Sequence, residues 1–167
     1  FIFEPGSSSG FVRFPPKSLI KNIANVVKGS GGKIIANEVT TGIGRTGKWF
    51  GYNHYQIEPD MIAIGKGIGN GYPVSITAIN RQTIDQLEKS SFKYSQSHQN
   101  DPLGAAIVNE VIKTIKDDDL ISKAKVIGNT FLKKLQTLKD GVKVIDVRGR
   151  GLMFALDLCN EKTGDYI

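Results

Sequence analysis

The chain has 167 residues, 40% hydrophobic and 23% charged, which is typical of a globular domain with a sizeable core. Its net charge is +6, but the 22 Lys and Arg residues are scattered and the single basic doublet is Lys133-Lys134, so we expect no nucleic-acid partner. No apolar stretch approaches the length of a membrane span, so we expect no membrane association. The single cysteine, Cys159, excludes an internal disulfide and favours a reducing, cytoplasmic setting.

Short apolar segments alternate with helical patterns along the first part of the chain. The expected strands are residues 1–4, 33–39, 61–65 and 74–79, and the expected helices are residues 15–28 and 81–89. Short buried strands that alternate with helices are typical of parallel sheets covered on their faces. The sequence therefore predicts an α/β fold with a mostly parallel sheet.

Two longer helices and a pair of strands follow. Asp101-Pro102 begins the first helix, and the three acids at 117–119 favour the start of the second, because carboxylates stabilise a helix N-terminus. Apolar residues recur at helical spacing between 120 and 138, and we assign them to the core. Residues 142–147 and 152–158 are expected to pair as strands on either side of a glycine- and arginine-rich turn.

This pattern predicts three parts. Residues 1–100 would form part of a large domain, residues 101–140 connecting helices, and residues 141–167 the beginning of a small α+β domain. The chain begins without methionine, apparently inside a strand, and ends without a closing element. We therefore expect it to be an internal piece of a longer protein.

The glycine-rich stretch 42–47 raises two nucleotide-binding interpretations that its surroundings argue against. It matches the dinucleotide fingerprint, but that motif needs a helix after the last glycine, and the residues that follow are poor helix formers. It also matches most of the P-loop motif, but Trp49 stands at the position where that motif needs a Ser or Thr hydroxyl to bind magnesium. His54, His98 and Cys159 lack the spacing of a metal site, so we expect no bound metal.

Lys66 is the most informative residue, because it ends an apolar run and is flanked by Gly65 and Gly67. An ammonium group at the end of a buried strand loses hydration, which lowers its pKa and frees the amine as a nucleophile. Such an amine can form a Schiff base with an aldehyde, and the glycines leave room for a bulky ligand. The alternative is a solvated lysine that caps a strand.

A second expected strand ends in Asn37-Glu38-Val39. Parallel sheets place ligands at the carboxyl ends of their strands, so this segment and Lys66 are expected at the same edge. Side chains alternate along a strand, so Asn37 and Val39 face one side and Glu38 faces the other. The first side would offer a polar contact and an apolar surface to a flat ring, with Lys66 reaching an aldehyde on that ring.

Taken together, these residues resemble the class III aminotransferases, the family of the 4-aminobutyrate, ornithine, acetylornithine and omega-aminotransferases. The similarity extends over essentially the whole chain, in order. The matching segments are residues 3–5, 38–47, 59–60, 64–67, 97–106 and 147–153. The resemblance implies the PLP-dependent transferase fold type I, pyridoxal 5′-phosphate (PLP) as cofactor, and a homodimer with active sites at the subunit interface.

The resemblance also implies roles for individual residues. Lys66 matches the catalytic lysine that holds the cofactor as a Schiff base and moves a proton between the substrate carbon and the cofactor. Val39 matches the residue packed on the ring face, and Ser97 matches a hydroxyl that contacts the cofactor phosphate from the neighbouring subunit. The implied reaction is amino transfer from an amine or amino acid to a 2-oxo acid.

Two cofactor positions depart from the family pattern. Asn37 stands where the family has an aspartate paired with the pyridine nitrogen, and an amide brings no charge to favour protonation of that nitrogen. Thr40 stands where many members have a glutamine near the 3-oxygen. Family members are also much longer, with an N-terminal phosphate loop and a C-terminal segment that contacts the substrate carboxylate. A second hypothesis is therefore a truncated, catalytically inactive relative that acts as a folded or dimerising scaffold.

Overall fold

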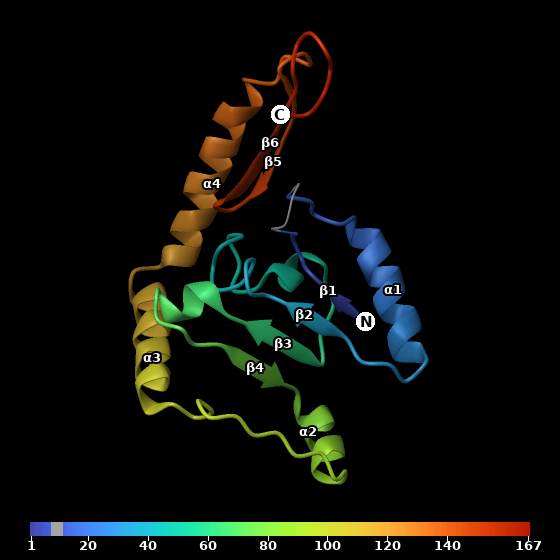
Figure 1. The fold of residues 1–167 in the computed structure, drawn as a ribbon, viewed down its shortest axis with the longest axis vertical. Helices are drawn as coiled ribbons and strands as arrows, with labels where there is room; N and C mark the ends of the chain where they lie inside the picture. Colours follow the sequence, from blue (N-terminus) through green and yellow to red (C-terminus); the bar gives the residue numbers. More distant parts are fainter. Residues whose placement is uncertain (8–11) are drawn as a thin grey trace.

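The computed structural model describes residues 1–7 and 12–167, which form an α/β fold with two separate sheets (Figure 1). The larger sheet has the strand order β1-β2-β3-β4, made of β1 (Ile2–Phe3), β2 (Ile35–Asn37), β3 (Met61–Ile64) and β4 (Ile76–Ile79). β1, β2 and β3 are parallel, and β4 is antiparallel to β3. The predicted mostly parallel sheet is therefore confirmed.

Four α-helices and two short 3-10 helices connect and cover the strands. They are α1 (Lys17–Gly29), α2 (Arg81–Glu88), α3 (Pro102–Asp117), α4 (Leu120–Gln136), η1 (Gly51–His54) and η2 (Lys66–Gly69). Asp101 caps α3, because its side chain accepts hydrogen bonds from the backbone N–H groups of Leu103 and Gly104. The residues after Gly47 form turns and then the single turn of η1, so the helix that a dinucleotide fingerprint needs does not follow it.

Helix α1 lies beside β1 and closes one part of the core (Figure 1). Ile20 and Ala24 of this helix are buried in a cluster with four residues of the sheet and the loop after it. These four are Phe3, Ile34, Ala36 and Tyr55. Each buried aliphatic or aromatic side chain of this kind contributes roughly 1.5–3 kcal/mol, so the cluster anchors β1 and β2 against α1.

Helix α3 closes the second part of the core, beside β3 and η2. Val108 is buried together with Ile64 and Ile68, and Gly104 lies so close to the loop before β4 that a Cβ on it would be 3.2 Å from Val74 Cγ2. The second cluster therefore packs directly under η2 and so positions the segment that begins with Lys66.

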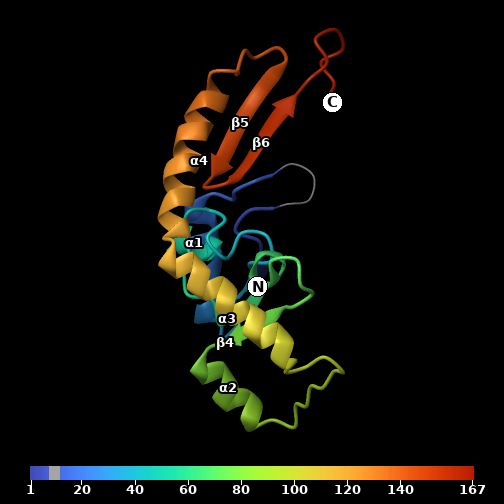
Figure 2. The same ribbon diagram turned by 90° about the vertical axis from the view of Figure 1, so that its left-hand side faces the viewer.

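Helix α4 and the second sheet project away from the larger sheet, as Figure 1 and the side view in Figure 2 show. The second sheet is an antiparallel pair of β5 (Val144–Arg150) and β6 (Met153–Leu158). The expected pairing is confirmed, but the turn lies at residues 151–152 rather than 148–151. Residues 148–150 continue the ladder opposite 153–155, and Gly151 has a φ of +56°, which lets the chain reverse after it.

The apolar stripe predicted along residues 120–138 is only partly core. Ala124 and Gly128 are buried, but Ile127 is 59% exposed and Phe131 is 47% exposed, although the Phe131 ring contacts Phe154 edge to face at 5.1 Å. One side of α4 packs against the hairpin of β5 and β6. The rest of the helix surface, including apolar residues of the stripe, is not covered. Of the three acids expected at the helix start, Asp117 ends α3, Asp118 follows it, and Asp119 is the residue directly before α4, which begins at Leu120.

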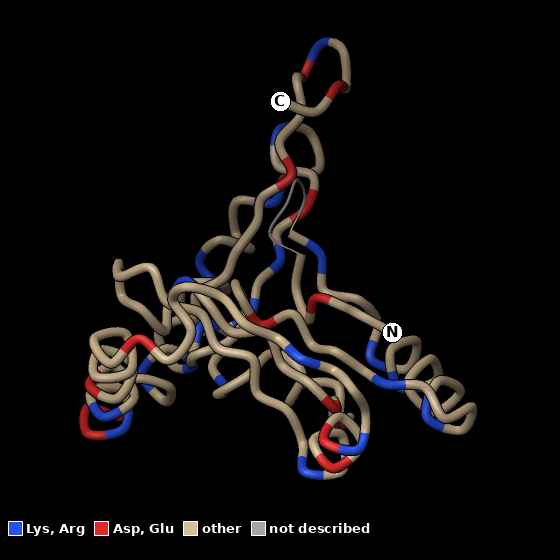
Figure 3. Tube along the Cα trace, turned by 60° about the horizontal axis from the view of Figure 1, so that its bottom comes forward, with Lys and Arg blue, Asp and Glu red and all other residues tan. Residues whose placement is uncertain are grey.

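Charged residues of both signs are spread along the described chain, with no element that gathers the basic residues (Figure 3). No helix within the described ranges is long and apolar enough to cross a membrane. Among the same residues, no three His, Cys, Asp or Glu side chains come together in a way that would hold a metal ion.

Candidate active site

Lys66 lies just beyond the carboxyl end of β3, as the first residue of η2. Its backbone has a φ of +46°, a left-handed conformation that is uncommon for a residue with a side chain and that clusters at functional sites. The expectation of a buried amine is wrong for this chain: Lys66 is exposed. The physical reason is its place one residue past Gly65, where the strand has ended and the chain turns outward over an open pocket.

A pocket of about 700 Å³ opens beside Lys66. Its walls come from the segment that follows β2, from η2 and the residue after it, from helices α3 and α4, and from the turn between β5 and β6 with the start of β6. The residues that line it are Val39, Thr40, Gly42, Ile43, Gly44, Arg45, Lys66, Gly67, Asn70, Glu110, Val111, Thr114, Ile115, Leu120, Ile121, Ala124, Leu152, Met153 and Phe154. Of the residues predicted to contact the cofactor, Lys66, Val39 and Thr40 line this cavity, whereas Asn37 does not.

Val39 lies directly over the backbone that leads into Lys66. A Cβ built on Gly65 would lie 3.5 Å from Val39 Cγ1 and 3.6 Å from Val39 Cγ2, which is ordinary van der Waals contact. The absence of a side chain at Gly65 leaves this space open next to the lysine. The arrangement brings an apolar surface and a primary amine to the same corner of the pocket.

Asn37 is the last residue of β2 and pairs with Ala63 of β3, so it stands at the carboxyl edge of the sheet. Its Nδ2 donates to Glu4 Oε1 at 3.2 Å, and its Oδ1 accepts from the backbone N–H of Val39 at 3.2 Å. The side chain is half-buried and held at both ends of its amide. The sequence places it correctly at the strand end but gives no sign of its contact with Glu4, which is 33 residues away.

Glu38 is 1% exposed and lies apart from the pocket. Its carboxylate accepts hydrogen bonds from Thr41 Oγ1 at 2.6 Å, from Gly51 N at 2.8 Å and from Tyr52 N at 2.7 Å. Burial raises the pKa of Glu38 above its usual value, while these three donors act in the opposite direction. Glu38 therefore holds the loop 40–52 in place, which fixes the pocket wall formed by residues 42–45.

Ser97 is not brought to the pocket. It lies in the exposed segment 89–100 between α2 and α3 and does not line the cavity around Lys66. The position that the resemblance matches to a phosphate contact is therefore not part of the cavity around Lys66 of the same chain.

Sequence reasoning missed the wall formed by the hairpin turn. The backbone N–H of Leu152 donates to the carbonyl oxygen of Arg45 at 2.8 Å, and Gly151 lies against the backbone of residues 45–47 so closely that a Cβ on it would overlap them. Gly128 of α4 also packs against the backbone of Gly151. The glycines at 128 and 151 were the signal, because two glycines of distant segments are needed where backbones meet.

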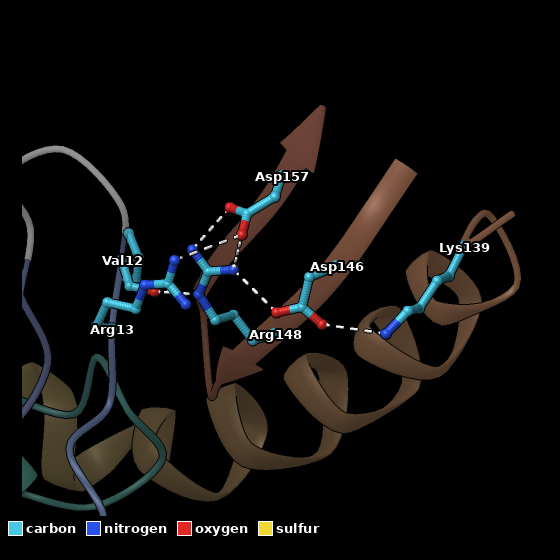
Figure 4. Close-up of polar contacts among 6 residues, drawn as sticks. All are labelled: Val12, Arg13, Lys139, Asp146, Arg148 and Asp157. Atoms are coloured by element: carbon cyan, nitrogen blue, oxygen red, sulfur yellow. Dashed lines mark hydrogen bonds and ion pairs between the residues drawn. The ribbon is translucent and has the colours of Figure 1, made fainter. Parts of the chain in front are cut away.

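Arg148 ties the same hairpin to the chain after the first strand (Figure 4). Its guanidinium donates two hydrogen bonds of 2.8 Å to Asp157 and one of 3.0 Å to Asp146, and its Nε donates to the carbonyl oxygen of Val12. Arg13 adds an ion pair with Asp157 at 3.7 Å. The hydrogen bonds from Arg148 hold the pKa of Asp157 below its usual value. This network sets where the turn 151–152 meets the pocket.

Arg150 makes a second connection between the hairpin and the larger sheet. Its guanidinium lies 4.6 Å from the ring centroid of Phe14 and 5.2 Å from that of Tyr55, and it donates to Tyr55 Oη at 3.0 Å. Tyr55 Oη in turn donates to the carbonyl oxygen of Pro5 at 2.5 Å. The segment of Glu4 and Pro5, next to Asn37, is therefore connected to the hairpin through the buried Tyr55 and the half-buried Arg150.

The whole chain, residues 1–167, matches the family model described as Aminotransferase class-III. A similar relative is "Uncharacterized aminotransferase YhxA" of Bacillus subtilis, 31% identical over 96% of this chain and 37% of its own length. The "Leucine/methionine racemase" of Thermococcus litoralis is 30% identical over 95% of this chain and 36% of its own length.

The fold agrees with solved structures of the same kind. A crystal structure of an S-selective transaminase from Arthrobacter sp. with alanine bound matches with a TM-score of 0.90 and 30% identity, over 98% of this chain and 35% of that one. The fold is that of the PLP-dependent transferases of fold type I, and the chain belongs to the class-III aminotransferase family. It spans little more than a third of the length of these relatives.

Membership of this family implies pyridoxal 5′-phosphate as the cofactor, and the residues at the strand edge fit three parts of that molecule. The amine of Lys66 suits an aldehyde, the apolar side chain of Val39 suits the face of an aromatic ring, and the amide of Asn37 suits a ring nitrogen. The space that a Cβ at Gly65 would fill adjoins both Lys66 and Val39.

Proposed function

We propose that this chain carries the cofactor lysine and the ring-binding edge of a PLP-dependent aminotransferase, which transfers an amino group from an amine or amino acid to a 2-oxo acid. One observation carries the proposal: Lys66, Val39 and Thr40 line a single pocket at the carboxyl ends of parallel strands, in a member of the class-III family. Ligands of open α/β sheets bind at this edge.

Each residue at the carboxyl edge of the larger sheet would have its own role toward the cofactor. When bound, PLP supplies a ring that draws electrons away from the carbon bearing the amino group. Lys66 would hold the cofactor through its aldehyde, Val39 would contact the ring face, Asn37 would face the ring nitrogen, and Thr40 would lie near the 3-oxygen. During amino transfer, Lys66 Nζ would take a proton from the substrate carbon and return it at the cofactor side.

We also propose a homodimer in which Ser97 contacts the cofactor bound at Lys66 of the partner. The segment 89–100 is exposed and contributes no residue to the pocket of its own chain, which supports an intermolecular role. Phe92 and Tyr94 of this segment are exposed aromatic side chains of the kind enriched at interfaces. A cytoplasmic location is supported by the single cysteine, Cys159, which is buried and free.

The proposal is tested by trapping the cofactor on the full-length protein. The protein is incubated with PLP, reduced with sodium borohydride, digested and analysed by mass spectrometry. We expect a pyridoxyl group on Lys66, together with a visible absorption band before reduction, and we expect Lys66→Ala to lose both. Lys48→Ala is the matched control, because Lys48 is an exposed lysine of the neighbouring loop whose Nζ donates to the Asn53 carbonyl oxygen at 3.0 Å.

Three results would contradict parts of the proposal. A folded protein without an adduct at Lys66 would overturn the cofactor assignment. An adduct without amino transfer, for any pair in a panel of amines, amino acids and 2-oxo acids, would favour the inactive scaffold. Exchange of the α-hydrogen of an amino acid without loss of its amino group would favour racemisation, the activity named for the Thermococcus relative.

A further inference from the structure

Glu4 and Asn37 form a hydrogen-bonded pair at the carboxyl ends of two adjacent parallel strands. In the register of β1 and β2, Phe3 pairs with Ala36, so each strand continues by one residue into Glu4 and Asn37. Asn37 Nδ2 donates to Glu4 Oε1 at 3.2 Å. On its other side, Asn37 pairs with Ala63, three residues before Lys66. The pair therefore stands at the sheet edge that the cofactor would occupy.

The two partners of Asn37 determine which way its amide points. A carboxylate accepts hydrogen bonds and a backbone N–H donates them, so Nδ2 must face Glu4 and Oδ1 must face Val39. The carbonyl oxygen of the amide is thereby turned toward the residue that lines the pocket. This oxygen keeps a second lone pair, which remains able to accept from a protonated ring nitrogen.

We propose that Glu4 is a positioning residue that supplies, through Asn37, the negative charge facing the pyridine nitrogen of the cofactor. The idea rests on the proposed function. A hydrogen bond to a carboxylate polarises the amide and increases the negative charge on its oxygen. The carboxylate itself attracts the positive charge of a protonated ring nitrogen across this short distance. Glu4 thus compensates for the charge that an asparagine at position 37 lacks.

The other carboxylates near the strands are placed elsewhere. Glu38 points to the far side of β2, where Thr41, Gly51 and Tyr52 occupy its oxygens. Asp60 lies at the amino end of β3, where its Oδ2 accepts from Ile34 N at 2.8 Å. Glu4 is the carboxylate that contacts Asn37, and its link to the cofactor edge is direct.

The test reads the protonation of the ring nitrogen rather than turnover. The full-length protein is loaded with PLP labelled with nitrogen-15 in the ring, and the nitrogen chemical shift is recorded by NMR at one pH. We expect a protonated nitrogen in the parent protein. In Glu4→Gln we expect the protonated fraction to fall, with its protonation constant about tenfold lower or more, as for the loss of a nearby opposite charge.

The double variant Glu4→Gln with Asn37→Asp exchanges the amide and the carboxylate between the two positions. An amide at position 4 can donate to a carboxylate at position 37, so the hydrogen bond is kept while the charge moves next to the ring. We expect the protonated nitrogen to return. Glu58→Gln, which removes an exposed carboxylate in the loop before β3, is the control for net charge and should leave the shift unchanged.

The outcomes separate this inference from the cofactor assignment. An unchanged nitrogen shift in Glu4→Gln, or an equal change in Glu58→Gln, would overturn the role of Glu4, as would a double variant that stays unprotonated. Borohydride trapping on Lys66 is run on every variant. If trapping succeeds in every variant but the nitrogen chemical shift in Glu4→Gln equals that of the parent protein, only the role of Glu4 is contradicted. If trapping fails in the parent protein, the proposed function is contradicted. A merely structural role would lower the unfolding temperature without moving the shift.

Discussion

Leu152 and Arg45 join two parts of the fold through one backbone hydrogen bond of 2.8 Å, from Leu152 N to the Arg45 carbonyl oxygen. Both residues line the pocket beside Lys66. The turn of the second sheet therefore forms part of the same cavity as the carboxyl edge of the first sheet. Any change that moves the turn changes the shape of the pocket. The packing around residue 151 therefore affects both the stability of the fold and the geometry of the site.

Gly128→Ala is expected to destabilise this junction. A Cβ at position 128 would lie 2.8 Å from Gly151 Cα and closer still to its carbonyl group, and Gly151 cannot retreat because it rests on the backbone of residues 45–47. Overpacking of this kind costs about 1–3 kcal/mol. Urea unfolding of the full-length protein measures the loss.

The matched control for this prediction is Gly29→Ala. Gly29 is the last residue of α1, and a Cβ there meets nothing within 4 Å. Because alanine favours helix over glycine by up to about 1 kcal/mol, this variant should be neutral or slightly more stable. Equal effects of the two substitutions would show that helix propensity, rather than the contact with Gly151, governs position 128.

Arg148→Lys tests the network that holds the hairpin. The Arg148 side chain is 15% exposed and Asp157 is 6% exposed, and a lysine keeps the charge but cannot reproduce the two parallel hydrogen bonds to that carboxylate. We expect a loss of about 1–3 kcal/mol in the free energy of unfolding. Differential scanning calorimetry would record it as a lower unfolding temperature.

Arg81→Lys provides the comparison. Arg81 pairs with Asp85 one helical turn away, at 2.8 Å, but both side chains are largely exposed. Exposed pairs of this type contribute little, typically less than about 1 kcal/mol. If Arg148→Lys were as harmless as Arg81→Lys, the hairpin would be held by the contacts of Gly151 and Arg150 rather than by the Arg148 network.

The sheet could be predicted from the sequence because its signals are local. Short apolar runs between helical patterns indicate parallel strands, and the strand ends put Asn37, Val39 and Lys66 at one edge. The structure confirms this common edge. The roles of these residues toward a cofactor, and the division into domains, stay predictions.

The parts that could not be predicted depend on contacts between distant segments. The exposure of Lys66 follows from a turn into η2 that an apolar run does not reveal. The bond between Glu4 and Asn37 joins residues from separate strands, and the pocket wall at Leu152 depends on where the hairpin docks. Hydrophobic periodicity specifies which face of an element is apolar, but it does not specify what covers that face, as the uncovered surface of α4 illustrates.

His54 is expected to make stability depend on pH. Burial lowers the pKa of His54 from 6.5 to about 4, and the nearby charges of Arg150 and Lys48 act in the same direction. The unfolded chain therefore binds a proton as the pH falls below about 6.5, whereas the folded chain does so only near pH 4. Stability should accordingly decrease as the pH falls through this window and become independent of His54 below it.

The size of this effect follows from the shift and the partial exposure of the ring. A full shift from 6.5 to about 4 would correspond to about 3.4 kcal/mol, and solvent around a half-buried ring reduces this to about 1–2 kcal/mol. Urea unfolding at a series of pH values would measure how steeply the free energy of unfolding changes with pH.

In His54→Gln this slope between pH 6.5 and 4 should become shallower. The difference between the two proteins removes the contribution of carboxylates that titrate in the same range. His98→Gln, which replaces an exposed histidine, should keep the slope of the parent protein. Parallel curves for the parent protein and His54→Gln would contradict this prediction, because they would show that His54 takes up its proton equally in the folded and unfolded states.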